Sequence, residues 1–533
     1  MNVGATFGNL SWLAASLPEY RRFKRDARNL ESTQRNRLQH YLRRNAGTAF
    51  GLQHGFGGIN SWEEYTEQVP VRDYDDFEPW ISRIAAGELK VLTQDPVRLF
   101  EPSSGSSGPA KLIPYTQSLQ REIRQGVAVW SANNFLSKPE LLSGRSYWSL
   151  TPQMDAMEST ESGIPVGFDE DSAYLGGITQ YLINRTLATK SALRLVDNMD
   201  VFWRVTLLML LQCRDLRFIS VWHPSYLGLL VERMRRNWPS LLQGLESGYS
   251  LNSPALCIHR SPARAHQLRA TGYDNLHLIW PNLRTISCWT DGNAATYIPQ
   301  LRSLFPEATL QAKGLLATEG FVTIPHGAHG ALRPLAIRSH VFEFLGNDDK
   351  VYAPWQIEKG EEYTVLITTG GGLYRYRLGD RIQVDGFFDE VPCLSFAGKE
   401  DQVSDFYGEK LNENFVANVF STVFAKHNID PHFALLAVEE SFTTPAYVLY
   451  LELDGEIPHS LALQVDQALR ENPHYDLCIR LGQLGNARIA RIPNDAFSLY
   501  AKRLSEMGMR LGDIKPTPLS RHNGWHRCFG IAH

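Results

Sequence analysis

The sequence lacks a long apolar run. It has 533 residues and a mean hydropathy of −0.26, and no uninterrupted stretch of about 18 apolar residues occurs in it. A helix needs a stretch of that length to cross the hydrocarbon core of a bilayer. We therefore exclude a membrane-spanning helix at the level of sequence and expect no membrane partner.

The sequence also lacks an excess of either charge. Lys and Arg number 53 and Asp and Glu number 57, which gives a net charge of −4. General nucleic-acid binding needs a strong basic excess or a clear basic stripe, so we expect no nucleic-acid partner. Hydrophobic residues make up 43% of the chain, which excludes disorder as a description of the whole. A single core stops growing at roughly 250–300 residues, so two or more domains are expected.

The sequence contains few cysteines, and they do not occur in closely spaced pairs. No two of the six cysteines lie at a CxxC interval, which argues against a zinc ribbon and a redox pair. Scattered cysteines in a long chain are typical of buried thiols in a reducing compartment. The apolar stretch Leu10–Leu17 precedes the basic cluster Arg21–Arg25, the reverse of the order in a secretory signal. The sequence therefore predicts a cytoplasmic protein.

The middle of the chain alternates helical patterns with short apolar runs. This alternation predicts an α/β architecture with largely buried strands. Helices are expected at 20–45, 117–134, 203–212, 226–236 and 297–305, and strands at 217–222, 276–280, 284–289, 309–312, 363–369 and 381–384.

The pattern changes after about residue 398. Helices at 411–426 and 460–471 and strands at 433–439, 446–453 and 487–492 indicate a compact α+β unit of about 130 residues. We place the domain boundary at Lys399–Asp401. The glycines and short polar residues around it fit a hinge, although an ordinary linker has the same composition.

The segment Ser103–Lys111 is the sharpest local signal. Its glycines and small hydroxylated residues allow backbone N–H groups and hydroxyls to converge on an anion, with Lys111 adding positive charge. It is not a Walker loop, because Lys111 lies three residues after Gly108 and is followed by Leu112. Taken alone, the segment fits a surface connection better than a phosphate site.

Two further segments carry polar groups suited to a nucleotide. In Ala317–Gly320, the hydroxyl of Thr318 stands beside the carboxylate of Glu319 and could serve a phosphate and its magnesium. The alternative is a plain turn before a strand at 321–324. Asp380, after Gly379, could accept hydrogen bonds from sugar hydroxyls, and the alternative there is a hairpin turn.

Taken together, the order and spacing of these segments resemble the adenylate-forming superfamily of acyl ligases. More narrowly, the chain is similar to the auxin-responsive acyl acid–amido synthetases and their bacterial relatives, nearly from end to end. Ser103–Lys111 and Gly372–Asp380 are the most specific segments. The resemblance implies a large, multi-layered N-terminal adenylating domain with β-sheets flanked by helices at 1–398. It also implies a hinge at 399–401 and a smaller, mobile α+β domain at 402–533.

The resemblance also implies roles for individual residues toward ATP and magnesium. Thr318 would contact the α-phosphate, Glu319 would hold magnesium, and Asp380 would bind the ribose hydroxyls. The loop around the β- and γ-phosphates would consist of Ser103, Ser104, Gly105, Ser106 and Ser107.

Three more positions complete the implied site. Lys399 would assist at the ribose, and Gly292 would lie near adenine. Lys515 matches the tail lysine that reaches the α-phosphate and the acyl carboxylate during adenylation.

The sequence departs from the family pattern at two positions. Leu315 stands where a tyrosine usually stacks on adenine, so the stacking is expected to be weaker or to come from another aromatic residue such as Phe321. Lys399 stands where many relatives have Arg, which keeps the charge but loses the planar, bidentate fork. Neither change removes a phosphate or metal group, so an active enzyme is expected.

The implied activity is ATP-dependent amide synthesis from a small carboxylic acid and an amine, such as an amino acid, with release of AMP. An acid–CoA ligase that shares the adenylation step is the alternative enzyme. A catalytically degenerate nucleotide-binding protein is a third possibility, and the retention of Thr318, Glu319, Asp380 and Lys515 argues against it. His223 could serve as a general base, but a structural histidine before Pro224 fits the sequence better.

Overall fold

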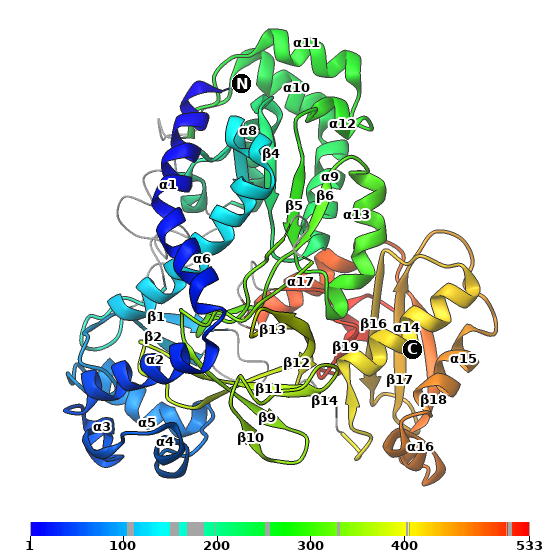
Figure 1. The fold of residues 1–533 in the computed structure, drawn as a ribbon. Coiled ribbons are helices and arrows are strands. Elements are labelled where there is room, and N and C mark those ends of the chain that lie inside the picture. The colour runs from blue at the N-terminus through cyan, green and yellow to red at the C-terminus, as the bar shows by residue number, and fades with distance from the viewer. Residues whose placement is uncertain are drawn as a thin grey trace. The chain divides into compact units, whose positions relative to one another are not determined.

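The computed structural model divides the chain into two compact units (Figure 1). The first comprises Met1–Thr290 and Ile298–Phe396, and the second Asp291–Tyr297 and Ala397–His533. None of the described helices is both long enough and apolar enough to cross a membrane. The structure describes residues 2–103, 111–149, 159–167, 186–196, 198–250, 256–327, 331–400, 403–404, 406–507, 509 and 514–531.

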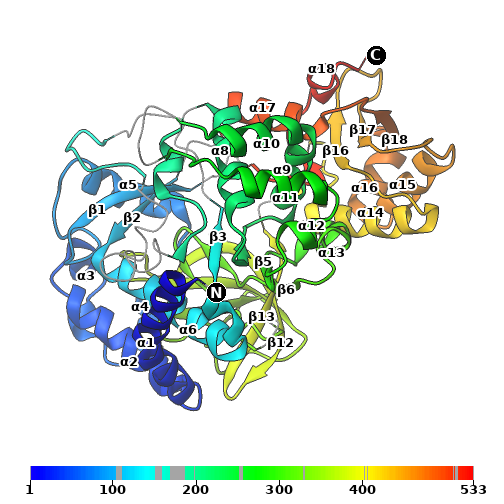
Figure 2. The same ribbon diagram turned by 90° about the horizontal axis from the view of Figure 1, so that it is seen from above.

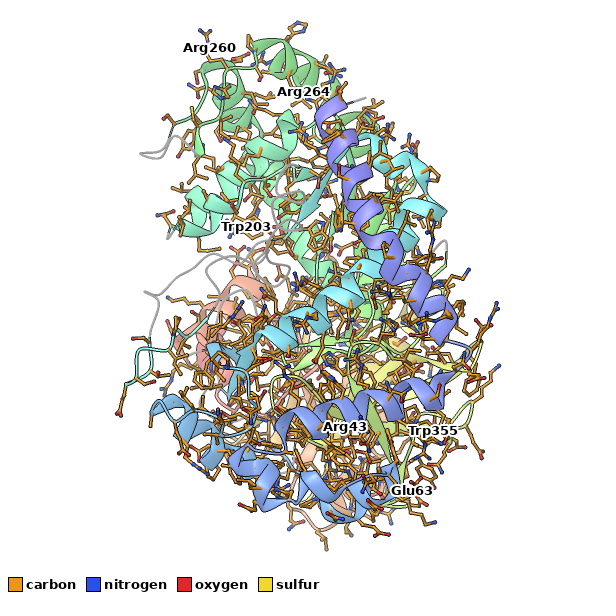
Figure 3. The ribbon with its side chains drawn as sticks, turned by 60° about the vertical axis from the view of Figure 1, so that its left-hand side comes forward. Arg43, Glu63, Trp203, Arg260, Arg264 and Trp355 are labelled. Atoms are coloured by element: carbon orange, nitrogen blue, oxygen red, sulfur yellow. The ribbon has the colours of Figure 1, made fainter. Side chains whose placement is uncertain are left out.

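The first unit begins with a run of helices. They are α1 (Val3–Asp26), α2 (Leu30–Asn45), α3 (Ala49–Gln53), η1 (Phe56–Gly58), α4 (Trp62–Gln68) and α5 (Tyr74–Ala85). The expectation of one helix over 20–45 is wrong, because the chain breaks between α1 and α2, where the backbone N–H of Leu30 donates to the carboxylate of Glu390 at 3.0 Å. Arg35 on α2 lies 2.9 Å from the carboxylate of Glu63 and 5.2 Å from the ring centre of Trp355, both labelled in Figure 3.

An antiparallel pair and a long helix follow. Strand β1 (Val97–Ser103) pairs with β2 (Lys111–Thr116), and Ser103 lies opposite Lys111. Helix α6 (Gln117–Ser137) starts at Thr116, whose hydroxyl accepts the backbone N–H of Leu119. α6 agrees with the helix expected at 117–134 and runs three residues further.

A parallel sheet forms the middle of the first unit. Its order is β3 (Arg145–Trp148), β4 (Leu216–Ser220), β5 (Thr285–Cys288) and β6 (Thr309–Ala312). The strands expected at 217–222, 284–289 and 309–312 are confirmed. The helices gathered around this sheet in Figure 2 include α8 (Met199–Gln212), α9 (Pro224–Arg236), α10 (Trp238–Ser247), α11 (Pro262–Thr271), α12 (Leu276–Ile279) and α13 (Ile298–Leu304).

The strand expected at 276–280 is wrong. This segment is the helical turn α12, because its buried residues Leu276 and Ile279 are three apart while Leu278 between them is 48% exposed. The buried Arg264 fixes the turn by donating to the carbonyls of Leu211 and Ile279 at 2.8 and 2.7 Å (Arg264 is labelled in Figure 3).

The remaining strands of the first unit form a hairpin and an antiparallel sheet. The hairpin joins β7 (Leu316–Ala317) to β8 (Gly320–Phe321). The strand expected at 321–324 ends at Phe321, because the backbone N–H groups of Val322 and Thr323 both turn back to the carbonyl of Leu315. The sheet has the order β10 (Val351–Tyr352), β9 (Val341–Gly346), β11 (Glu362–Thr368), β12 (Tyr376–Phe388) and β13 (Val391–Lys399). The last three residues of β13 already belong to the second unit.

The second unit is the α+β structure that the tail of the sequence predicts. Alternate residues of the inner strand β16 (Phe433–Glu439) pack into two different hydrophobic clusters on the two faces of the sheet. Leu436 and Val438 belong to one cluster, and Leu435 and Ala437 belong to the other. Both faces of the sheet are therefore covered by helices. The elements are β14 (Val403–Ser404), β15 (Leu411–Asn412), α14 (Glu413–His427), β16 (Phe433–Glu439), β17 (Ala446–Glu452), α15 (Leu461–Leu469), α16 (Pro473–Arg480), β18 (Gly485–Arg491), α17 (Ala496–Glu506), β19 (Leu519–Ser520) and α18 (Trp525–Cys528).

Candidate active site

Thr318 and Glu319 form the two-residue loop of the β7–β8 hairpin. Ala317 pairs with Gly320, so the segment is a turn, as the plainer interpretation of the sequence predicted. The carboxylate of Glu319 is buried, at 8% exposure, and accepts a hydrogen bond of 3.4 Å from the hydroxyl of Tyr376. A Cβ atom at Gly320 would lie 2.8 Å from Nε2 of His340, so a larger residue there would displace the hairpin.

Asp380 lies in a β-bulge rather than in a hairpin turn. Thr364 of β11 pairs with Arg381 of β12, and Leu366 pairs with Arg377. An advance of two residues on β11 therefore lies opposite an advance of four residues on β12. Gly379 has φ +74°, which a glycine adopts without strain. Asp380 is 3% exposed. The bulge therefore carries a carboxylate on the same strand as Tyr376, the residue that donates to Glu319.

A buried ion pair fixes the turn before β12. The guanidinium of Arg375 lies 3.0 Å from the carboxylate of Glu343, and both side chains are buried. Arg375 also donates to the carbonyls of Thr66 and Val69 at 2.7 and 2.6 Å. Because a buried charge is tolerated only when paired and hydrogen-bonded, this network holds the start of β12 in one place. Sequence reasoning missed the pair, whose members are 32 residues apart.

The end of the Ser/Gly loop at Lys111 contacts Tyr74. The amine of Lys111 lies 5.5 Å from the ring centre of Tyr74, and the backbone N–H of Leu112 donates to the Tyr74 hydroxyl at 2.7 Å. Burial raises the pKa of Tyr74; the hydrogen bond from Leu112 opposes the shift, and the charges of Glu78, Asp75 and Glu319 add to it. Ser103 ends β1, whereas Ser104, Gly105, Ser106 and Ser107 lie outside the described residues.

Helix α6 connects the β7–β8 hairpin to the glycine-rich turn at Gly370–Gly372. Glu122 accepts the backbone N–H of Gly370 at 2.9 Å and lies 3.0 Å from Nδ1 of His340. Nε2 of His340 in turn accepts the backbone N–H of Phe321 at 3.0 Å. Burial lowers the pKa of His340, which favours the neutral ring that this acceptor role requires. Glu122 and His340 were not among the residues that the sequence singled out.

The structure also bears on the missing adenine-stacking tyrosine. Phe321 is 4% exposed, and a Cβ atom at Gly126 of α6 would lie only 2.7 Å from its ring. The ring is therefore packed against α6, which argues against Phe321 as the residue that stacks on adenine in place of a tyrosine at Leu315.

Gly292, Lys399 and Lys515 belong to the second unit. Gly292 begins η6 (Gly292–Tyr297) with φ +55°. The side chains of Lys399 and Lys515 are exposed, and the positive charges of both act on Glu413, the first residue of α14. The second unit therefore brings these two lysines toward one carboxylate. Asp401 of the expected hinge lies outside the described residues.

Glu413 leads to a prediction about stability. Burial raises the pKa of its carboxyl group to about 7, although a hydrogen bond from Thr517 and the charges of Lys515 and Lys399 oppose the shift. A folded-state pKa above the unfolded value means that ionisation costs stability as pH rises from about 4.5 through 7. We expect the difference in free energy of unfolding between Glu413→Gln and the wild type, measured by urea unfolding, to shift in favour of the variant from pH 5 to pH 8. The expected shift is about 1–3 kcal/mol. An equal difference at both pH values would contradict it.

The donor set near Glu319 fits a magnesium ion that arrives with phosphates. In the parts of the chain that the structure describes, no group of three or more His, Cys, Asp or Glu side chains is arranged to hold a metal ion on its own. Magnesium commonly uses one or two carboxylates together with phosphate oxygens and water. A single buried carboxylate at Glu319, next to the hydroxyl of Thr318, matches that requirement.

His223 has a structural role in the fold. It stands at the N-cap of α9, where Nδ1 accepts the backbone N–H of Ser225 at 3.3 Å and lies 2.7 Å from its hydroxyl. This cap agrees with the structural interpretation of the histidine.

The family comparison covers most of the chain. Residues 19–310 match the GH3 family N-terminal domain, 334–399 the GH3 family central domain, and 415–524 the GH3 family C-terminal domain. Among similar proteins, the indole-3-acetic acid-amido synthetase GH3.4 of Arabidopsis thaliana is 25% identical over 425 residues, covering 72% of this chain and 70% of that protein. GH3.6 of the same plant is 24% identical over 525 residues, covering 86% and 83%.

Solved structures agree on the fold. The acyl acid amido synthetase AtGH3.15 in complex with 2,4-DB superposes with a TM-score of 0.85 at 20% identity, covering 97% of this chain and 96% of that one. A 2-hydroxyisobutyryl-CoA ligase in the postadenylation state gives a TM-score of 0.52 at 10% identity, covering 90% and 92%. The α/β fold with a large first part and a smaller second part is therefore the fold of adenylate-forming ligases. Since the N-terminal domain alone matches more than half of the residues, this chain belongs to the GH3 family.

Proposed function

We propose that the protein is an ATP-dependent acyl acid–amido synthetase. It activates a small carboxylic acid as an acyl adenylate and transfers the acyl group to an amine, such as an amino acid, with release of AMP. Membership of the GH3 family and the amido synthetases among its relatives support this proposal. The observation that carries it is the hydrogen bond from Tyr376, on the strand that bears Asp380, to the buried carboxylate of Glu319.

The chemistry accounts for these residue types. A carboxylate is a poor electrophile at neutral pH, so its oxygen first attacks the α-phosphorus of ATP and pyrophosphate leaves. The protein has little covalent work to do, and its task is to position groups and stabilise phosphate charge. In this proposal Lys111 and Thr318 face the phosphates and Asp380 accepts the ribose hydroxyls. Magnesium, when bound at Glu319, supplies positive charge to the phosphates.

The second unit supplies the lysines. We propose that Lys515 reaches the α-phosphate and the acyl carboxylate during adenylation, that Lys399 assists at the ribose and that Gly292 lies near adenine. A turn about residues 399–401 would then withdraw Lys515 and admit the amine. The exposed side chain of Lys515 is compatible with such a temporary contact.

Two assays test the proposal. Exchange of labelled pyrophosphate into ATP that depends on an added acid is the expected result, and its absence with every acid of a broad panel would favour a degenerate nucleotide-binding protein. Comparing amino acids with CoA as acceptors then separates an amido synthetase from an acid–CoA ligase. The fold likeness to a CoA ligase makes that comparison necessary.

Asp380→Ala is expected to weaken ATP binding by about 10- to 100-fold. The change removes a charged acceptor, and such a hydrogen bond contributes about 1.5–3 kcal/mol. Isothermal titration with ATP measures the effect, and Asp385→Ala provides a control on an exposed carboxylate of the same strand. An unchanged dissociation constant in a folded Asp380→Ala protein would remove Asp380 from the nucleotide site.

A further inference from the structure

Lys313 is a lysine for which the proposed reaction has so far no use. It follows directly after β6, and its backbone N–H donates to the carbonyl of Cys288 at 2.8 Å. Its amine lies 2.9 Å from the hydroxyl of Ser220, which ends β4. The amine thus stands at the carboxyl ends of three parallel strands, the edge at which open α/β sheets bind ligands.

Two aromatic rings lie close to the amine. It lies 4.1 Å from the ring centre of Trp222 and 5.9 Å from that of Trp130. Among the described residues, no Asp or Glu forms an ion pair with it. The titratable group that faces it is the thiol of Cys288, and burial raises the pKa of that thiol to about 12, so it is neutral at physiological pH. His223, next to Trp222, contacts Ser225 instead.

Burial disfavours the charged form of this amine. It lowers the pKa of Lys313 to about 7, and no Asp or Glu among the described residues pairs with the amine to oppose the shift. A lysine of this kind can exchange a proton near neutral pH, as an ordinary surface lysine cannot.

Helix α6 contacts both Lys313 and the hairpin that carries Thr318 and Glu319. Gly126 packs against Phe321 of the hairpin, and Trp130, four residues further along the helix, faces Lys313. Four residues of helix advance about 6 Å, so these two contacts lie about one turn apart along the same face of α6. The connecting chain is fixed, because a Cβ atom at Gly314 would lie 2.1 Å from the carbonyl of Thr323.

We propose that Lys313 is the general base of the amide-forming step and takes a proton from the ammonium group of the acceptor. The inference rests on the proposed function and deepens it. The Nζ lone pair of Lys313 accepts one proton, and the freed nitrogen lone pair attacks the acyl carbonyl carbon to form the C–N bond. The bond from that carbon to the phosphate oxygen breaks, AMP leaves with the electron pair, and the second proton passes to water. A base suits this step because the acceptor is protonated, and therefore not nucleophilic, at neutral pH.

The experiment compares two nucleophiles on chemically made benzoyl adenylate. Glycine carries an ammonium group at neutral pH and needs a base, whereas hydroxylamine is largely unprotonated and does not. Lys313→Met and Lys313→Arg are the variants, since arginine keeps the charge but cannot act as a base at these pH values. We expect both variants to lose about 100-fold or more with glycine and less than about fivefold with hydroxylamine. The wild-type rate with glycine should fall below pH 7, and this fall should be absent in the variants.

Equal losses with both nucleophiles, or recovery of the glycine rate by arginine, would overturn the assignment. A wild-type protein that converts benzoyl adenylate with neither nucleophile, and shows no acid-dependent pyrophosphate exchange, would overturn the proposed function and the inference with it. Tryptophan emission provides a readout that needs no turnover, because the ammonium lies over Trp222. A pH titration of emission should show a midpoint near 7 in the wild type that Lys313→Met abolishes, and a wild-type midpoint above 9 would contradict the proposal.

Discussion

Glu319→Gln is expected to lower acid-dependent pyrophosphate exchange by on the order of 100- to 1000-fold. Glutamine keeps the shape of the side chain and can still accept the hydrogen bond from Tyr376, but it lacks the negative charge that a hard cation prefers. The substitution should therefore weaken the response of pyrophosphate exchange to added magnesium, and it should leave the protein folded. Titrating magnesium at saturating ATP measures it directly.

The matched control is Glu362→Gln. Glu362 is a carboxylate in the same unit, on β11, and pairs with Arg381 at the surface. It should leave the magnesium titration unchanged, since exposed ion pairs contribute little. Wild-type magnesium dependence in folded Glu319→Gln would show that the carboxylate is only a turn residue and that the metal binds elsewhere.

Much of the fold follows from local pattern. The buried strands at 217–222, 284–289 and 309–312 are short apolar runs between helical segments, and this alternation is a local property that sequence reasoning can read. The break between α1 and α2 is not local, because it is stabilised by Glu390, which lies 360 residues further along the chain. The assignment of Asp291–Tyr297 to the second unit likewise depends on tertiary packing.

Some features of the candidate site could likewise be predicted from local sequence, and others depend on tertiary structure. Glu319 and Asp380 could be picked out because their short motifs combine polar residues with glycine, and the resemblance gave them roles. The bulge around Asp380 depends on the register between β11 and β12, which no local pattern fixes. Glu122 and His340 are single residues in unremarkable surroundings, and only the folded chain brings them together behind the hairpin.

Glu413 is a further residue that the sequence did not identify. It follows the N-cap residue Asn412, so its position at the start of a helix can be predicted from the sequence. Acidic residues are common at that position. Its proximity to Lys399 and Lys515 is a property of the folded second unit.

Lys515→Ala tests both the assignment of the lysine and the order of the two half-reactions. The backbone of Lys515 is anchored, since its carbonyl accepts a hydrogen bond of 3.0 Å from the hydroxyl of Tyr500, whereas its side chain is exposed. The substitution should therefore leave the fold intact. We expect acyl-adenylate formation to slow by on the order of 100-fold or more, because a positioned cation is removed from the developing phosphate charge. Pyrophosphate exchange measures this step.

The second half-reaction should respond differently. If the second unit turns about residues 399–401 between steps, Lys515 is remote during amine attack, and Lys515→Ala should use supplied acyl adenylate and amine at nearly the wild-type rate. Lys502→Ala, which removes an exposed lysine from α17 of the same unit, is the control and should change neither step. Equal slowing of both steps would contradict the turning unit while keeping Lys515 at the nucleotide. Wild-type rates in both would place Lys515 among solvated surface residues, whose substitution changes stability by no more than about 0.5 kcal/mol.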